Sequence, residues 1–223
     1  MAIINHSFNF VFVHVPKSAG TSIVSSLSSL TRYCDVEVGG AVMSRFTTEY
    51  YSKRFRLSKH SRAVDVRNII GDERWNSMYS FGFVRNPVDR LVSSYHFLKY
   101  KFRNWKGSEV MDGIDSLDAF VDSELFASHG PDRILRPQVF WLCGPPGRRP
   151  VVTSFGRVER IGEDLERILD EIAVPAAERA KMPALAVKNR SPREEGAAQP
   201  SAHVLDVVRK AYADDFRVFG YEL

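Results

Sequence analysis

The residue types best suited to bind an anion stand together near the start of the chain, between an apolar run and a helical pattern. A lysine supplies a positive charge, serine and threonine supply hydroxyl donors, and a glycine lets the backbone approach a ligand closely. All of these types occur in one run of six residues: Lys17, Ser18, Ala19, Gly20, Thr21 and Ser22. This composition predicts an anion-binding loop, and a plain turn with a surface lysine is the alternative.

The segments on either side of this loop should place it at the start of a helix. Residues 8–15 carry large apolar side chains on both alternating faces, which is typical of a strand buried on both sides. Pro16 ends this run, because proline cannot donate to a strand ladder. After the loop, Ile23, Leu27 and Leu30 recur at the spacing of one helix face. The unpaired N–H groups and the positive dipole end of that helix would then attract an anion.

The loop differs from a Walker A motif, in which the lysine directly follows the second glycine. Here Lys17 comes three residues before the single glycine of the loop, Gly20. Anion binding therefore remains the expectation, but nucleoside triphosphate hydrolysis does not follow from it.

A second informative stretch covers residues 79–100. Residues 80–84 are a candidate buried strand, and Asn86 and Pro87 suit the N-cap and the first position of a helix. Apolar residues at helical spacing follow, namely Val88, Leu91, Val92, Tyr95 and Leu98. Arg85 would stand where the strand ends, and Ser93 two turns along the helix, so both could bind one anion. Arg90 is the nearby alternative, and surface residues without a ligand are the plain interpretation.

Length and composition predict one soluble domain over residues 1–223, with 44% hydrophobic and 26% charged residues. We find no apolar run of membrane-spanning length and no signal-peptide pattern. Cys34 and Cys143 form no motif, which fits a reducing cytoplasm, although the pair could bridge. The six histidines stand at no metal-ligand spacing, so we expect no metal site. Residues 184–200 are expected to form a long loop.

The net charge of +4 is unevenly distributed along the chain. Residues 45–67 contain seven basic and two acidic side chains, whereas residues 109–132 contain seven acidic ones and no lysine or arginine. The basic stretch could be an ordinary solvated face or a rim that attracts an anionic substrate. No nucleic-acid-binding motif accompanies it, so we do not expect a nucleic acid as partner.

Together, the two anion-binding stretches resemble the cofactor motifs of the sulfotransferases. FVHVPKSAGTS resembles the 5′-phosphosulfate loop of these enzymes, and VRNPVDRLVSSY resembles their 3′-phosphate motif. The forms VPK-x-x-G-T-S and RNP-x-x-R-x-x-S-x-Y point to the carbohydrate-type, family-2-like branch with bacterial-type members, and weaker likenesses extend over most of the chain. The resemblance implies a P-loop-like, three-layer α/β fold with a central parallel sheet flanked by helices.

The resemblance also implies 3′-phosphoadenosine-5′-phosphosulfate (PAPS) as co-substrate and a role for each motif residue. Lys17 and the loop N–H groups would hold the phosphosulfate, while Thr21 and Ser22 would bind the 5′-phosphate. Arg85 and Ser93 would bind the 3′-phosphate. Arg193 in the NRSPR segment would close over the nucleotide, and Arg157 would lie near the adenine. No metal is needed, because the protein itself supplies the positive charge.

Sulfuryl transfer needs a base for the acceptor hydroxyl, and histidine titrates near neutrality. The carbohydrate-type enzymes that this chain resembles carry their base histidine at a place similar to His60, which precedes Arg85 by 25 residues. We therefore expect His60 to be the base, with Glu73 or His96 as alternatives. His14 lies inside the first predicted strand, where a core histidine is expected.

The expected reaction is sulfuryl transfer from PAPS to a hydroxyl, on a sugar if the branch is a guide. An ATP-dependent kinase of the P-loop type and a non-catalytic nucleotide-binding domain are the alternatives. The sequence indicates neither the identity of the acceptor nor the oligomeric state.

Overall fold

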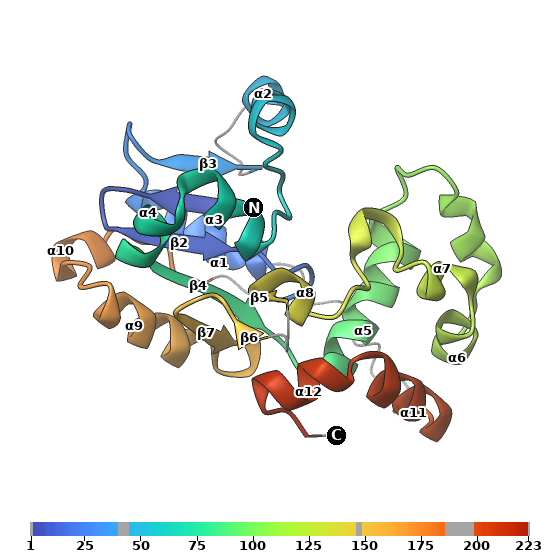
Figure 1. Cartoon of the computed structure of the whole chain (residues 1–223). Coiled ribbons are helices and arrows are strands. Elements are labelled where there is room, and N and C mark those ends of the chain that lie inside the picture. Colours follow the sequence, from blue (N-terminus) through green and yellow to red (C-terminus); the bar gives the residue numbers. More distant parts are fainter. Residues whose placement is uncertain (1, 40–44, 146–148, 186–198, 223) are drawn as a thin grey trace. The chain divides into compact units, whose positions relative to one another are not determined.

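The computed structural model describes residues 2–39, 45–145, 149–185 and 199–222 (Figure 1). The chain falls into two compact units. The first comprises Met1–Val84 and Gln138–Lys188, and the second comprises Arg85–Pro137 and Asn189–Leu223. The expectation of one domain over residues 1–223 stays a prediction.

A five-stranded sheet forms the centre of the first unit. The strands, in the spatial order β3-β1-β2-β4-β7, are β3 (Val36–Val38), β1 (Ala2–Asn5), β2 (Phe10–Val13), β4 (Tyr79–Val84) and β7 (Ser154–Arg157). β2, β4 and β7 run parallel, whereas β1 is antiparallel to both of its neighbours. The expected central parallel sheet is therefore present as a mostly parallel one, with β1 as its antiparallel strand. The antiparallel strand comes from the N-terminus, where the sequence predicted no strand.

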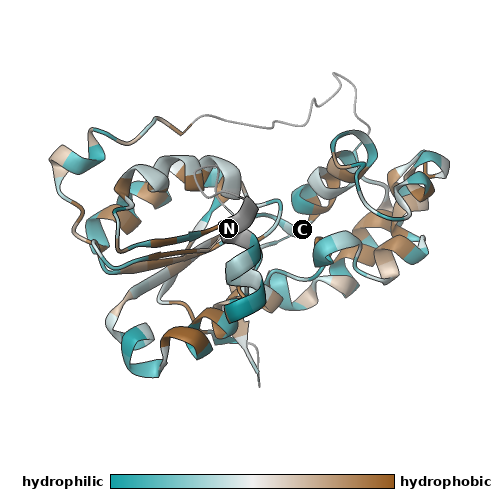
Figure 2. Ribbon diagram, turned by 90° about the horizontal axis from the view of Figure 1, so that it is seen from above, coloured by the Kyte–Doolittle hydropathy of each residue, from teal (hydrophilic) through white to brown (hydrophobic). Residues whose placement is uncertain are grey.

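Helices cover both faces of this sheet, so the first unit has three layers (Figures 1 and 2). On one face, Phe10, Phe12, Phe81 and Phe83 pack against the apolar residues of α1 (Gly20–Leu27) and α9 (Ile161–Glu171). On the other face, Leu142 closely approaches Gly82 of β4. Leu142 belongs to α8 (Val139–Leu142), which packs with α3 (Ala63–Ile70). The mixed α/β architecture is thus confirmed, while the P-loop-like assignment stays a prediction.

The remaining elements of the first unit are short, apart from one helix. They are η1 (Ser28–Leu30), α2 (Arg45–Phe55), α4 (Asp72–Ser77), β5 (Cys143–Gly144), β6 (Arg149–Pro150), η5 (Val158–Arg160) and α10 (Ala176–Arg179). Among the helices of this unit, α2 and α3 lie in the basic stretch of residues 45–67 and just beyond it. Asp72 is the first residue of α4. Cys34 and Cys143 are both free thiols.

The described part of the second unit is helical. Its elements are α5 (Pro87–His96), the π-helical turn η2 (Phe97–Lys101), η3 (Ser108–Gly113), α6 (Leu117–Val121), α7 (Glu124–Ala127), η4 (Pro131–Arg133), α11 (Ala202–Ala211) and α12 (Ala213–Phe219). Their apolar faces form one core around Tyr95, Phe120 and Tyr212. The Asn86 side chain accepts a hydrogen bond from the N–H of Val88 at 2.9 Å, as its expected N-cap role requires. In neither unit does the described part of the chain contain a helix long and apolar enough to cross a membrane.

Candidate active site

The predicted anion-binding loop connects β2 to α1 in the first unit. Two of its non-glycine residues, Lys17 (φ 65°) and Ala19 (φ 55°), adopt a left-handed backbone conformation. Such conformations are strained in L-residues and cluster at ligand sites. Tight turns that contain them can also direct successive N–H groups into one concavity, which suits an anion. The loop geometry therefore fits the binding of a phosphate or sulfate group, and Lys17 adds its charge.

The hydroxyl residues of the loop differ in exposure. Thr21 is exposed, whereas Ser18 and Ser22 are buried. The Ser18 hydroxyl donates to Oε1 of the fully buried Gln138 at 3.2 Å, and the Ser18 N–H donates to the carbonyl of Val15. Both donors of Ser18 are thus used inside the protein, which suits a residue that shapes the loop.

The buried His14 packs directly against this loop. A Cβ atom on Gly20 would overlap Cδ2 and Nε2 of the His14 imidazole, so no larger residue fits at Gly20 unless that ring moves. Burial holds the pKa of His14 well below its usual value, and the nearby charges of His60, Lys59 and Lys17 lower it further. His14 is therefore a neutral imidazole at neutral pH. It confirms the expected core histidine, although it lies just past the end of β2 rather than within the strand.

His60 lies beside His14 in the segment between α2 and α3. The centroids of these two rings are 4.6 Å apart. The ring centroid of Trp141, a residue of α8, lies 6.0 Å from that of His60. A hydrogen bond also holds the main chain of the half-buried His60, because its N–H donates to the Ser58 hydroxyl at 3.3 Å. The structure thus brings the expected base and the anion-binding loop together, with His14 in contact with both.

Arg157 ends β7 at the same sheet edge as the loop. β2, β4 and β7 are parallel, and Val84 at the end of β4 is paired with Arg157. Ligands of open α/β sheets bind outside the carboxyl ends of the strands, which is where this edge lies. The main-chain N–H of Arg157 donates to the buried carboxylate of Asp164 at 2.7 Å, so the strand end is fixed to α9.

Arg85 and Ser93 belong to the second unit. Arg85 directly follows β4 and is half-buried, and Ser93 is buried on α5. Arg90, the alternative arginine, is 1% exposed and donates hydrogen bonds of 2.8 Å to the carbonyls of Ile134 and Arg136. Its guanidinium holds the helical core together, so Arg85 is the better candidate for an anion. Arg193 lies outside the described residues.

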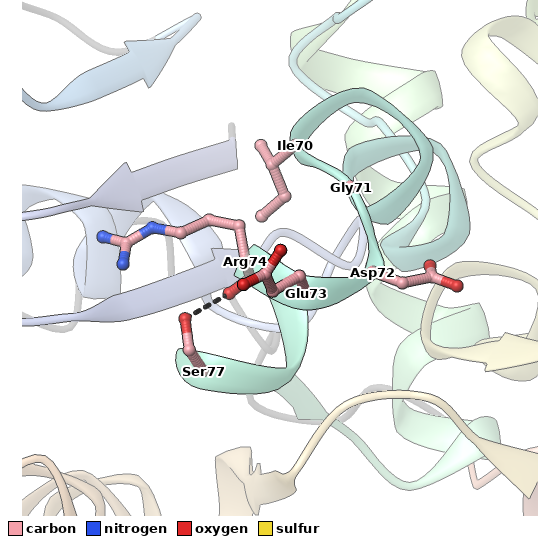
Figure 3. Close-up of a pocket in the computed structure, with 6 residues that line it drawn as sticks. All are labelled: Ile70, Gly71, Asp72, Glu73, Arg74 and Ser77. Carbon is pink, nitrogen blue, oxygen red and sulfur yellow. Dashed lines mark hydrogen bonds between the residues drawn. The ribbon is translucent and has the colours of Figure 1, made fainter.

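Of the two alternative bases, Glu73 belongs to the first unit and His96 to the second. Glu73 lines a pocket formed by Ile70, Gly71, Asp72, Arg74 and Ser77 (Figure 3). His6 and Asn9 belong to the turn between β1 and β2. Arg74 contacts His6 at 3.0 Å, and Asn9 donates to the carbonyl of Ser77, so the pocket lies beside this turn. That turn precedes β2, whereas the anion-binding loop follows β2, so the two lie at opposite ends of this strand. His96 belongs to the second unit, where its ring stacks on Tyr100 at 5.9 Å.

Sequence reasoning missed the contacts around the anion-binding loop and His60. His14 could have been recognised, since it is a polar residue within an apolar run next to the loop. Gln138 and Trp141 gave no signal, because their partners are far away along the chain. Gln138 bonds to Ser18 of the loop across 120 residues, and Trp141 packs against His60. Among the residues that the structure describes, no group of three or more histidine, cysteine or acidic side chains could hold a metal ion.

The chain was compared with known proteins and family models. Residues 1–222, which span both units, match the model of a family described as the sulfotransferase family. A search of the curated proteins and of the solved structures found no match to this sequence.

Proposed function

Because the chain belongs to the sulfotransferase family, we propose that it transfers the sulfuryl group of PAPS to an acceptor hydroxyl, on a carbohydrate or glycoconjugate. One observation carries this proposal most directly. The loop of Lys17 to Ser22, with its left-handed backbone, and the imidazole of His60 lie in contact with the same buried histidine. A site for the transferred anion and a base therefore stand together.

The proposed chemistry is an in-line displacement. His60 takes the proton of the acceptor hydroxyl as the oxygen forms its bond to sulfur. The bond between sulfur and the phosphate oxygen breaks, and its electron pair leaves on that oxygen. Lys17 and the loop N–H groups stabilise the negative charge that develops there, so catalysis comes from positioning and preorganised charge. PAPS supplies the sulfuryl group and departs as 3′,5′-ADP.

The remaining expected contacts are with the phosphates and the base of the nucleotide. In this proposal Thr21 and Ser22 bind the 5′-phosphate, Arg85 and Ser93 the 3′-phosphate, and Arg157 lies near the adenine. Thr21 is exposed and able to donate directly. Arg193, from a segment that is not described, would close over the nucleotide. No contact in this set needs a metal ion.

A sugar acceptor with acidic groups is supported by the surface of α2. Its Tyr50 and Phe55 are exposed, their rings are 6.3 Å apart, and the guanidinium of Arg54 lies 6.0 Å from the Phe55 ring. Aromatic rings present an apolar face to a sugar, and cations attract its carboxylates or sulfates. His60 follows Phe55 by five positions in the chain, so at most about 18 Å separates their backbones. A short oligosaccharide could span that distance.

Thermal denaturation with nucleotides tests the donor. A ligand that binds the native state stabilises it, by about 2.7 kcal/mol at 100 times its Kd. For a chain of this size we expect 3′,5′-ADP at that concentration to raise the Tm by roughly 5–10 °C, and 5′-ADP to raise it less. Mg-ATP should have little effect. Stabilisation by Mg-ATP alone would contradict the proposal and favour the ATP-dependent kinase.

A further inference from the structure

One buried histidine touches both parts of the proposed site without a part in the reaction. The His14 ring lies against Gly20 of the anion-binding loop and 4.6 Å from the His60 ring. On a further side, the ring of Phe12 stacks on it at 6.4 Å and 22°. The side chain is only 5% exposed. It therefore contacts the loop and the base at once while it is shielded from solvent.

We propose that His14 is a positioning residue whose imidazole holds the ring of His60 at a fixed place relative to the anion-binding loop. The inference rests on the proposed function, since it takes His60 as the base. His14 itself takes no proton in this proposal, because burial leaves it little access to an acceptor hydroxyl.

The two histidines differ in how firmly the backbone holds them. His14 directly follows β2, a central strand paired on both sides, and packs among core residues. His60 belongs to the connection between α2 and α3. Its ring meets His14 in one direction and Trp141 in another, so these two aromatic neighbours constrain its orientation. His14 therefore connects the central strand to the ring of His60.

A histidine suits this place better than a charged residue would. The lowered pKa of His14 keeps the imidazole neutral while Lys17 and Lys59 stand nearby. A neutral neighbour adds no repulsion when His60 becomes protonated during the reaction. The ring is also small enough to lie against Gly20, where even a Cβ atom would collide with it.

Replacing the ring tests the proposal. In His14→Ala, His60 loses one of its two aromatic neighbours, and we expect kcat to fall by about 10- to 100-fold, the scale on which misplacing a reacting group by 1 Å acts. The KM for PAPS and the Kd for 3′,5′-ADP should change by less than about threefold, since the nucleotide contacts remain. Val11→Ala is the matched control, because Val11 is a buried residue of β2, the strand that His14 directly follows. It should lower the Tm and leave kcat at a temperature where the protein is folded within about twofold.

A second measurement needs no variant and covers the case in which His14→Ala does not fold. In the wild-type protein, NMR should show a nuclear Overhauser effect between the ring protons of His14 and His60, and a ring-current shift of the Gly20 α-protons. In His14→Ala, where it folds, the His60 ring resonances should move. Absence of the Overhauser effect would overturn the proposed contact.

The remaining outcomes distinguish the claim about His14 from the proposed function. Normal kcat in His14→Ala, or equal losses of kcat and nucleotide affinity, would reduce His14 to a structural residue. Loss of turnover in His14→Ala with retention in His60→Ala would make His14 the base and overturn its positioning role. By contrast, a wild-type protein that fails to bind 3′,5′-ADP would overturn the proposed function, and the NMR contact would still report on His14.

Discussion

His60→Ala is expected to lower the turnover of sulfuryl transfer by about two to four orders of magnitude, the usual contribution of a positioned base. The attacking hydroxyl loses its proton as the bond to sulfur forms, so the base acts in the transition state. His60 can act there because its ring lies beside His14, which in turn contacts the loop that would hold the sulfuryl donor.

The expected loss is confined to turnover. The Kd for 3′,5′-ADP and the Tm should remain close to the wild-type values, because His60 is a half-buried residue of a connecting segment. His6→Ala is a suitable control, since His6 lies in the turn at the opposite end of β2, where it contacts Arg74. It should leave turnover unchanged. Near-normal turnover of His60→Ala with the true acceptor would remove His60 from the mechanism.

Arg85→Ala is expected to weaken the binding of 3′,5′-ADP by about 2–4 kcal/mol, the scale for losing a charged hydrogen-bond partner. This corresponds to a rise in Kd of roughly 30- to 700-fold. Arg85 is assigned to the 3′-phosphate because the side chain of the other motif arginine, Arg90, is bonded within the helical core. The Kd for 5′-ADP, which lacks the 3′-phosphate, should change far less. Isothermal titration with both nucleotides measures the difference.

A control arginine of the same unit sharpens this comparison. Arg217 on α12 is paired with Asp214 at 2.8 Å on the surface, and Arg217→Ala should leave the affinity for both nucleotides unchanged. If Arg85→Ala weakens the binding of 3′,5′-ADP and 5′-ADP equally, Arg85 supports the structure and does not read the 3′-phosphate.

The parts of the fold that depend on neighbouring residues were predictable from the sequence. The N-cap at Asn86 is set by a side chain that bonds a main-chain group two residues away, and this cap is present. β1 was missed because it has four residues and its identity comes from pairing with β2 and β3, which lie further along the chain. A strand this short gives too little periodicity to be distinguished from a tail.

In the candidate site, too, the features set by neighbouring residues were predictable and those set by distant residues were not. Lys17 to Ser22 were proposed as an anion-binding loop from their residue types alone, since small and cationic residues before a helix suit an anion for local reasons. The sequence favoured Arg85 and kept Arg90 as the alternative, but it could not show which partners Arg90 has. Arg90 is bonded to carbonyls 44 and 46 residues away, and such partners appear only when the chain is folded. The contact between His14 and His60 is non-local for the same reason.

The most direct test of the account is the transfer itself. The protein should be incubated with sulfur-labelled PAPS and a panel of neutral and acidic glycans, and the products analysed by mass spectrometry, with His60→Ala as a parallel sample. We expect one glycan class to gain a sulfuryl group while 3′,5′-ADP accumulates, and the variant to form little product. If the protein binds 3′,5′-ADP but no acceptor in a broad panel of glycans and other hydroxyl compounds gains the label, the proposed transferase activity is contradicted and a non-catalytic nucleotide-binding protein is indicated.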